Sequence, residues 1–210
     1  MKVVTPITIT PATYLKTPAT YGYSNATDYP EWSVATAYAI GDRVIVDAMQ
    51  STFECISANT GNAPVLAPAT SIYWIRVGAS NAWKPFDAIV SSLSVGYNAA
   101  SQLADLMCFQ LIGLGRFNTV CILSTDAASV RVRFSLDGGA TFAYNMSMRA
   151  VDTSPVIDAW TYLTADLNVA RDFVFEGIDG YGTTSAFVLQ IFVQNDGTGI
   201  PVEVGEIVVG

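Results

Sequence analysis

Residues 130–136 read Val-Arg-Val-Arg-Phe-Ser-Leu, and this stretch decides the fold. Apolar and polar side chains alternate in it with a period of two, which is the pattern of a strand with one buried face. Arg131 and Arg133 are expected to point outward. The buried face is predicted to carry Val130, Val132, Phe134 and Leu136.

Further strand patterns lie on both sides of this stretch. An Asp-Gly-Gly turn at residues 137–139 leads into residues 141–144 and predicts a β-hairpin. Residues 187–193 are almost continuously apolar, as in a strand that is covered on both faces. A short helix near residues 160–167 is a weaker candidate. With further strands at residues 106–112, 120–123, 172–175 and 203–209, the pattern predicts an all-β fold, in which residues 83–210 form an antiparallel, jelly-roll-like β-sandwich.

Residues 31–82 form a second segment with its own pattern. Apolar runs at residues 38–46, 53–56 and 73–78 are separated by turns and by a loop rich in Gly, Asn and Pro. They predict a small module of three short strands.

Residues 1–30 are rich in Thr, Pro and Tyr, and prolines at positions 6, 11, 18 and 30 prevent a helix from propagating. An extended N-terminal arm is predicted, with a disordered tail as the alternative. We expect the arm to contact another subunit, and the C-terminal strand to lie in the sandwich near that contact. The expected anchors of this assembly interface are Tyr14, Leu15, Tyr21 and Tyr23.

Composition narrows the classes of function. The 210 residues are 51% apolar, which is ample for a packed core, and only 13% charged. Ordinary soluble domains have about 25% charged residues, so we infer that part of this surface meets other protein. The net charge of −8 and the lack of clustered Lys and Arg argue against a nucleic-acid partner. No export signal or membrane-spanning segment is recognised, so no membrane insertion is expected.

The chain contains no histidine, which removes imidazole bases, Ser-His and Cys-His nucleophile systems and the commonest metal ligand. Three cysteines, Cys55, Cys108 and Cys121, are too widely spread for a zinc site. Their apolar neighbours predict buried free thiols, which fits assembly in a reducing cytoplasm. No metal and no other cofactor is expected.

The predicted module resembles the small chitin- and cellulose-binding modules of carbohydrate-binding families 5 and 12. Their pattern is a Trp, then Tyr-x-x-Gly-Asp-x-Val, a Tyr/Phe-x-Cys strand, a proline-containing loop and a closing Trp. An aromatic pair that the family carries after the Cys strand is replaced here by residues 57–59, Ser-Ala-Asn. The matching positions are, in order, Trp32, Tyr38, Gly41, Asp42, Val44, Phe53, Cys55, Pro64 and Trp74.

Sugar binding requires exposed aromatic faces, because the apolar faces of sugar rings pack on aromatic rings. In so small a module, Trp32 and Trp74 supply most of the available core and are predicted to be buried. Tyr38 and Tyr73 are the candidate carbohydrate-binding residues that this resemblance leaves.

No catalytic residue is predicted. Residues 135–142, Ser-Leu-Asp-Gly-Gly-Ala-Thr-Phe, resemble the Asp-box turn of sialidases, which is a structural hairpin outside the active site. Asp172, Glu176 and Asp179 are close in sequence, but they are typical of a solvated strand end and turn rather than of an acid pair. Residues 196–199, Asp-Gly-Thr-Gly, supply one carboxylate and predict a hairpin turn rather than a calcium loop.

Three motifs extend the resemblance to the whole chain: Asp-Tyr-Pro-Glu-Trp at residues 28–32, Gly-Ala-Ser-Asn-Ala-Trp-Lys-Pro-Phe-Asp at 78–87, and Gly-Glu-Ile-Val-Val-Gly at 205–210. Together with the Thr/Pro-rich arm, they resemble a family of tailed-bacteriophage virion proteins. These are tail or tail-tip components without enzymatic activity.

The resemblance implies a structural protein of the phage tail that joins or decorates other tail proteins, present in several copies as a homo-oligomer in the virion. The alternative is a glycan-binding module that touches host surface polysaccharide. Two or more exposed aromatic side chains in one plane would favour the alternative. A glycosidase or depolymerase is a third candidate, disfavoured because no acid pair is recognised.

Overall fold

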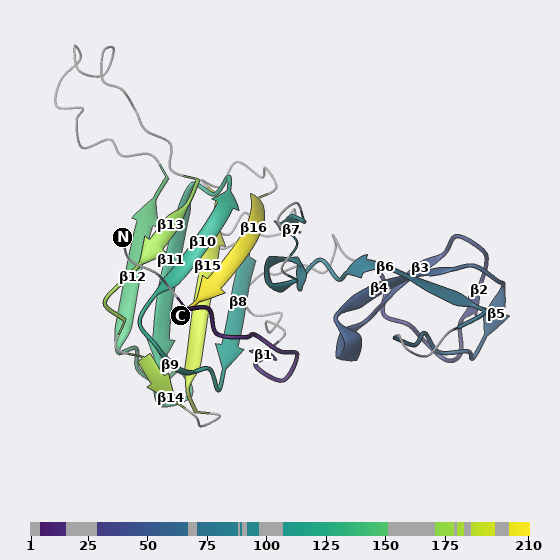
Figure 1. The fold of residues 1–210 in the computed structure, drawn as a ribbon, viewed down its shortest axis with the longest axis horizontal. Coiled ribbons are helices and arrows are strands. Elements are labelled where there is room, and N and C mark those ends of the chain that lie inside the picture. Colours follow the sequence, from purple (N-terminus) through teal and green to yellow (C-terminus); the bar gives the residue numbers. More distant parts are fainter. Residues whose placement is uncertain are drawn as a thin grey trace, which may run out of the picture.

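The computed structural model describes residues 5–15, 29–66, 71–87, 89, 92–96, 107–150, 171–178, 180–182, 186–195 and 202–210. In these residues the fold is all β, as predicted, with two short 3-10 turns. A β-sandwich and a smaller β module lie beside one another along the long axis of the molecule (Figure 1).

One layer of the sandwich is a five-stranded antiparallel sheet of order β1-β8-β15-β11-β12. The predicted hairpin is confirmed, because β11 pairs along its length with β12. The strand β15, predicted to be covered on both faces, is almost entirely buried. The bounds are β1 (Tyr14–Leu15), β8 (Met107–Ile112), β15 (Val188–Gln194), β11 (Ser129–Ser135) and β12 (Tyr144–Arg149).

The other layer is a four-stranded antiparallel sheet of order β13-β10-β16-β7. A two-stranded sheet of β9 and β14 lies at one end of the sandwich (Figure 1). The bounds are β13 (Phe173–Phe175), β10 (Val120–Thr125), β16 (Val202–Val209), β7 (Ser94–Gly96), β9 (Gly115–Phe117) and β14 (Gly180–Gly182).

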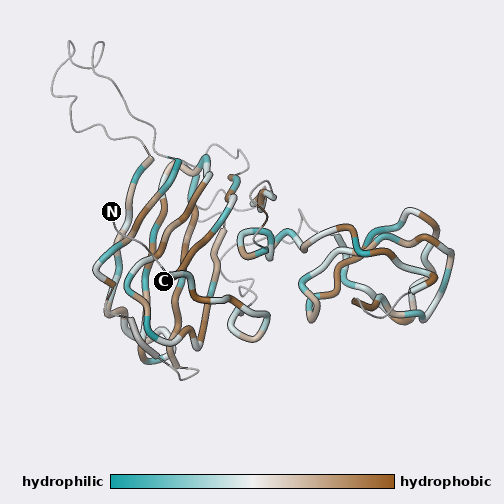
Figure 2. The backbone as a smooth tube through the Cα atoms, in the orientation of Figure 1, coloured by the Kyte–Doolittle hydropathy of each residue, from teal (hydrophilic) through white to brown (hydrophobic). Residues whose placement is uncertain are grey.

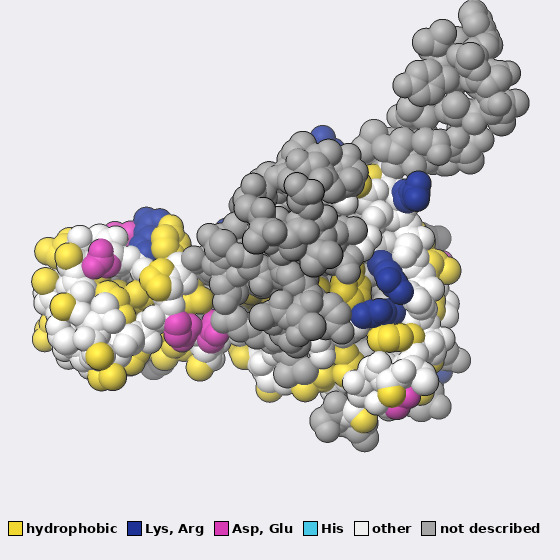
Figure 3. Space-filling view, turned by 180° about the vertical axis from the view of Figure 1, so that it is seen from behind, with side chains coloured by type: hydrophobic (Ala, Val, Ile, Leu, Met, Phe, Trp, Pro, Cys, Tyr) yellow, Lys and Arg dark blue, Asp and Glu magenta, His cyan; other side chains and the backbone are white. Residues whose placement is uncertain are grey.

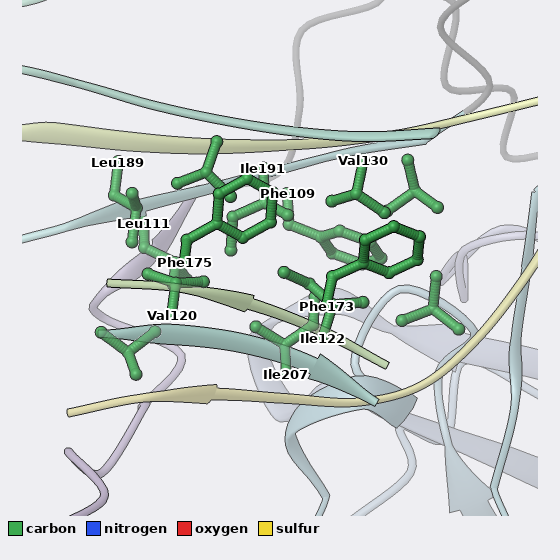
Figure 4. Packing of buried hydrophobic residues seen from close by; sticks show 14 of the residues in the cluster. Phe109, Leu111, Val120, Ile122, Val130, Phe173, Phe175, Leu189, Ile191 and Ile207 are labelled. Atoms are coloured by element: carbon green, nitrogen blue, oxygen red, sulfur yellow. The ribbon is translucent and has the colours of Figure 1, made fainter. Parts of the chain in front are cut away.

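The core lies between the two layers, where alternate side chains of each sheet meet (Figure 4). Val130, Val132 and Phe134 of β11 are buried there, as the alternating pattern predicts. They face side chains such as Ile122 of β10 and Phe175 of β13. Figure 2 shows the hydrophobic segments concentrated along these strands.

The prediction made from the alternating pattern is wrong for its last residue, Leu136. Leu136 is 53% exposed, although it was predicted to share the buried face. The strand β11 ends at Ser135, whose hydroxyl accepts hydrogen bonds from the backbone N–H groups of Asp137 and Gly139. These bonds begin the turn one residue earlier and move Leu136 out of the sheet. The predicted helix near residues 160–167 and the predicted turn at 196–199 lie outside the described residues.

The module contains the predicted three-stranded sheet, in the order β3-β4-β6. A two-stranded sheet of β2 and β5, which was not predicted, packs with it. Five buried side chains form a core separate from that of the sandwich: Tyr38, Val44, Phe53, Cys55 and Trp74. The bounds are β2 (Ala37–Tyr38), β3 (Arg43–Val46), the 3-10 turn η3 (Asp47–Met49), β4 (Ser51–Cys55), β5 (Asn59–Thr60) and β6 (Trp74–Ala79).

The joint between the two units is fixed by the motif at residues 78–87. The side-chain amide of Asn81 accepts a hydrogen bond from the backbone N–H of Val95 (2.9 Å) and donates one to its carbonyl (2.7 Å). Asn81 thus binds β7 as a neighbouring strand would. The 3-10 turn η4 (Lys84–Phe86) follows, and Trp83 and Phe86 pack against the sandwich core.

The described part of the arm docks on its own sandwich. The backbone N–H of Ile7 donates to the carbonyl of Val209 (2.7 Å), and β1 pairs with β8. Tyr14 is 5% exposed and its ring contacts those of Trp83 and Phe86, with centroids 5.8 and 5.6 Å apart. In this chain Tyr14 therefore packs on its own sandwich, and a contact of the arm with another subunit stays a prediction.

The remaining arm residues are described only in part. Leu15 pairs with Gln110 through its main chain, and Tyr21 and Tyr23 lie outside the described residues. The C-terminal strand lies in the sandwich, as predicted, because β16 pairs with both β10 and β7. Its residue Val209 accepts the hydrogen bond from Ile7 of the arm.

We expect Gly205→Ala to destabilise the sandwich by about 1–3 kcal/mol, the usual range for overpacking. A Cβ at Gly205 would lie 2.8 Å from the Cβ of Ser124 and 3.1 Å from the carbonyl oxygen of Leu123. Ser124 already has a left-handed φ of 54° and is held in β10, so it has little freedom to move. Urea unfolding measures the change.

The matched control is Gly78→Ala in β6, where an added Cβ meets no atom within 4 Å. Equal losses of stability in the two variants would contradict the close approach of β10 and β16 at Gly205.

Candidate functional site

Trp74 and Tyr38 lie in the core of the module, whereas Trp32, which was also predicted to be buried, is buried only in part. Trp74 is 4% exposed, and its indole N–H donates to the carbonyl of Asn62 (2.7 Å), so its predicted core position is confirmed. Trp32 is partly buried and packs against the same cluster. Tyr38 is 8% exposed, with its ring edge-on to Trp74 at a centroid distance of 5.0 Å. Its hydroxyl accepts a hydrogen bond from the backbone N–H of Ser33 (2.8 Å).

This geometry argues against Tyr38 as a carbohydrate ligand, because its ring faces are used in packing. The family resemblance left Tyr38 as a candidate ligand, but its ring packs on Trp74 and its hydroxyl is bonded to the backbone of Ser33. Tyr73 is partly buried against the module core and is the candidate ligand that keeps some exposure. Tyr38 and Tyr73 therefore do not form a pair of exposed aromatic faces.

The end of the module that faces away from the sandwich, here called the distal end, carries three exposed isoleucines. Strand β6 runs toward the sandwich (Figure 1), so Ile72, which precedes it, is distal. Ile56 follows β4, which is antiparallel to β6, and Ile40 precedes β3, which is antiparallel to β4. Ile40, Ile56 and Ile72 are 72%, 44% and 74% exposed.

Backbone hydrogen bonds bring these three positions together. The N–H of Gly41 donates to the carbonyl of Cys55 (2.8 Å), and the N–H of Ile56 donates to the carbonyl of Tyr73 (2.8 Å). Each isoleucine is therefore one of these bonded residues or a chain neighbour of one. Sequence reasoning missed this cluster, because isolated isoleucines beside strand ends look like ordinary core residues.

Exposed apolar side chains of the described residues concentrate in the module. Nine of the thirteen large ones lie between residues 29 and 77, and eight of these nine are aliphatic. The exception, Tyr29, lies beside Arg43, which donates to its hydroxyl (3.0 Å) and forms an ion pair with Glu54 (2.8 Å). Hydrophobic side chains are spread over the module in Figure 3.

Three carboxylates, among them Asp172 of the group considered above, accept hydrogen bonds from backbone N–H groups. Glu31 accepts hydrogen bonds from the N–H of Asp47, and Asp42 accepts one from Ala39 (2.7 Å). Asp172 accepts one from Ser124 (2.8 Å), while Asp179 lies outside the described residues. These contacts give the described carboxylates structural roles in turns and strand ends.

The turn that resembles an Asp box is also structural. Hydrogen bonds from Ser135 and from the side chain and backbone of Thr141 hold the pKa of Asp137 well below its usual range. Asp137 therefore stays ionised and keeps the β11–β12 connection closed.

The cysteines are free thiols, as predicted, but only two are buried. Cys55 and Cys108 lie in the interior, whereas Cys121 on β10 is partly exposed. Burial raises the pKa of the Cys121 thiol, and the negative charge of Glu176 adds to the shift. A raised pKa keeps this thiol protonated and unreactive at neutral pH.

A shallow groove of about 210 Å³ lies between the arm and β16, with Glu206 as its one carboxylate among apolar neighbours such as Ile7 and Phe86.

No cluster of metal-ligating side chains is found among the described residues. In the same part of the chain, no helix has the length and apolarity needed to cross a membrane. Comparisons with family models, curated proteins and solved structures give no match for this chain.

Proposed function

We propose that this chain is a non-enzymatic structural protein of a bacteriophage tail, in which the sandwich is the body and the module binds a neighbouring tail protein. The observation that carries the proposal is the exposed cluster of Ile40, Ile56 and Ile72 at the distal end of the module. Burying such side chains against a partner contributes roughly 25 cal/mol for each Å² of apolar surface removed from water.

The type of exposed side chain favours protein over sugar as the partner. Sugar rings pack on flat aromatic faces, and the module uses Trp74 and Tyr38 in its own core. Its exposed large apolar side chains are mainly aliphatic, which fits a protein partner whose own apolar side chains fill the gaps between them. The likeness to carbohydrate-binding families 5 and 12 then concerns the scaffold.

The absence of enzymatic activity is part of the proposal and is supported by the polar contacts. Glu31, Asp42 and Asp172 each accept a backbone hydrogen bond, and the groove beside β16 has one carboxylate in its lining. Glycoside hydrolysis, the enzymatic alternative considered, would need two carboxyl groups that face one substrate.

The test is incorporation of a variant with Ile40→Ser and Ile72→Ser into tail particles that carry this chain in place of the wild type. We expect the variant to fold normally, since exposed substitutions usually change stability by less than about 0.5 kcal/mol. Its incorporation should fall at least tenfold. The control is Ile89→Ser, which removes an exposed isoleucine outside the module.

Normal incorporation of the double variant would overturn the proposed contact. Binding of chitin oligosaccharides by the wild-type chain, lost on Tyr73→Ala, would instead support the glycan-binding alternative.

A further inference from the structure

Strand β12 forms one edge of the five-stranded sheet and is open to solvent. Its pairing partner among the described residues is β11, on one side only. Asn145, Met146 and Ser147, in the middle of the strand, are exposed. An edge strand of six residues without proline is a template for pairing with another chain, and proteins usually block such edges.

The outer face beside this edge is positively charged. In the register of the hairpin, Val132 pairs with Met146 on the core side, so Arg131 and Arg133 of β11 lie on the opposite, outer face. Arg149 pairs with Ser129 and lies on that same outer face. Dark-blue side chains gather over this side of the sandwich in Figure 3.

Two of these arginines donate hydrogen bonds to neutral partners. The Nε–H of Arg131 donates to the amide oxygen of Asn145 (2.8 Å), and that of Arg133 donates to the amide oxygen of Gln190 (2.7 Å). No described carboxylate forms an ion pair with either of them or with Arg149. Three uncompensated positive charges on one face stand out in a chain of net charge −8.

The guanidinium of Arg133 is also fixed in position. It lies 4.2 Å from the ring centroid of Phe142 and 4.5 Å from that of Phe192. Phe142 follows the turn that Asp137 closes through Thr141, so this turn keeps the aromatic ring on the arginine. A preorganised cation loses little conformational entropy when it binds a carboxylate.

The core side of the same edge is apolar and incompletely covered. Met146 is 43% exposed, and Tyr144 and Met148 on either side of it are partly buried. Side chains of a strand alternate between the two faces of a sheet. A strand added next to β12 would therefore place one set of side chains beside Arg149 and near Arg131, whose Nε–H reaches Asn145 of β12, and the other set beside Met146. Arg133 is turned toward Gln190 of β15 and adds positive charge to the same face.

We propose that β12 accepts an added strand from another protein, namely an extended segment in which carboxylates alternate with apolar residues. This inference deepens the proposed function by naming the chemistry of a second tail contact, and it rests on that function for its biological setting. Main-chain hydrogen bonds would hold the added strand on β12. The arginines would select a partner that carries carboxylates. Pairing of β12 with β12 of a second copy is disfavoured, because it would join two faces of like charge.

The test uses a fluorescein-labelled peptide of four Val-Glu repeats and measures its binding to the full chain by fluorescence anisotropy. We expect saturable binding that weakens as the salt concentration rises. Bound peptide should also slow the exchange of backbone amide hydrogens at residues 145–149 of β12. A peptide of four Val-Lys repeats should bind at least tenfold more weakly. The Val-Glu peptide with alternate backbone nitrogens methylated should also bind at least tenfold more weakly, because it cannot form all the main-chain hydrogen bonds of strand pairing.

The variant is Arg131→Gln with Arg149→Gln, and its matched control is Arg43→Gln in the module. We expect at least a tenfold loss of affinity in the double variant and no change in the control. Equal binding of the methylated peptide, or equal binding of polygalacturonate with loss in the double variant, would overturn strand addition in favour of a site for any polyanion. Because this assay uses no phage particle, its failure leaves the proposed tail function untouched, and the reverse also holds.

Discussion

Trp74→Ala is expected to unfold the module and leave the sandwich folded. Truncating a buried aromatic side chain costs about 3–5 kcal/mol, because the cavity adds to the lost transfer free energy. Trp74 packs on Tyr38 and donates to the carbonyl of Asn62, so the variant also leaves a backbone acceptor without its partner. A core of five buried side chains gives the module a small free energy of unfolding, and we expect this loss to exceed it.

Amide hydrogen exchange resolved by residue measures this outcome. We expect protection to disappear in β3, β4 and β6 and to persist in β10 and β15. Tyr29→Ala, which truncates an exposed aromatic side chain of the same unit, serves as the control and should keep the wild-type pattern. A folded Trp74→Ala module that merely lost affinity for a glycan would show that Trp74 is a ligand.

The strands could be predicted because their patterns are local. The alternation around Val132 and the apolar run around Leu189 determine which faces are buried, and both strands lie where they were expected. Trp74 was predicted correctly for a similar reason, since a small module has few other side chains with which to fill a core. The end of β11 was missed because the hydroxyl of Ser135 takes part in the turn, which leaves Leu136 in solvent.

The candidate site was less predictable, because it depends on contacts between distant residues. Tyrosine is a residue type suited to binding a sugar, so Tyr38 was a candidate ligand. Its burial depends on Trp74, which lies far along the chain. Isoleucine is a residue type usually found in the core, so the distal isoleucines were not singled out. Their exposure follows from the ends of three strands meeting at one place. Neither fact is contained in a local pattern.

The arm illustrates the same limit. Its aromatic anchors predict docking, but they do not specify the surface on which they dock. The rings of Trp83 and Phe86 receive Tyr14, and they reach that position only when Asn81 has bound β7. The apolar character of the arm was recognised correctly, whereas the intrachain surface that receives Tyr14 was not foreseen, because it forms only in the folded chain.

Tyr14→Ala is therefore expected to destabilise the sandwich by about 3–5 kcal/mol, the range for buried aromatic side chains. Tyr14 belongs to the same hydrophobic cluster as Phe109 and Leu111, and its strand covers one edge of β8. Removing residues 1–15 should cost more than the single substitution, because the hydrogen bond from Ile7 to Val209 is lost as well.

Urea unfolding followed by intrinsic fluorescence gives both free energies, and Thr8→Ala, at an exposed arm position, serves as the control. Because Tyr14 docks within its own chain, the unfolding midpoint of the wild type should not depend on protein concentration. If the truncated chain unfolded at the wild-type midpoint, the arm would contribute nothing to its own sandwich. A midpoint that rose with protein concentration would show that the arm is exchanged between copies, and Tyr14 would then be an anchor between subunits.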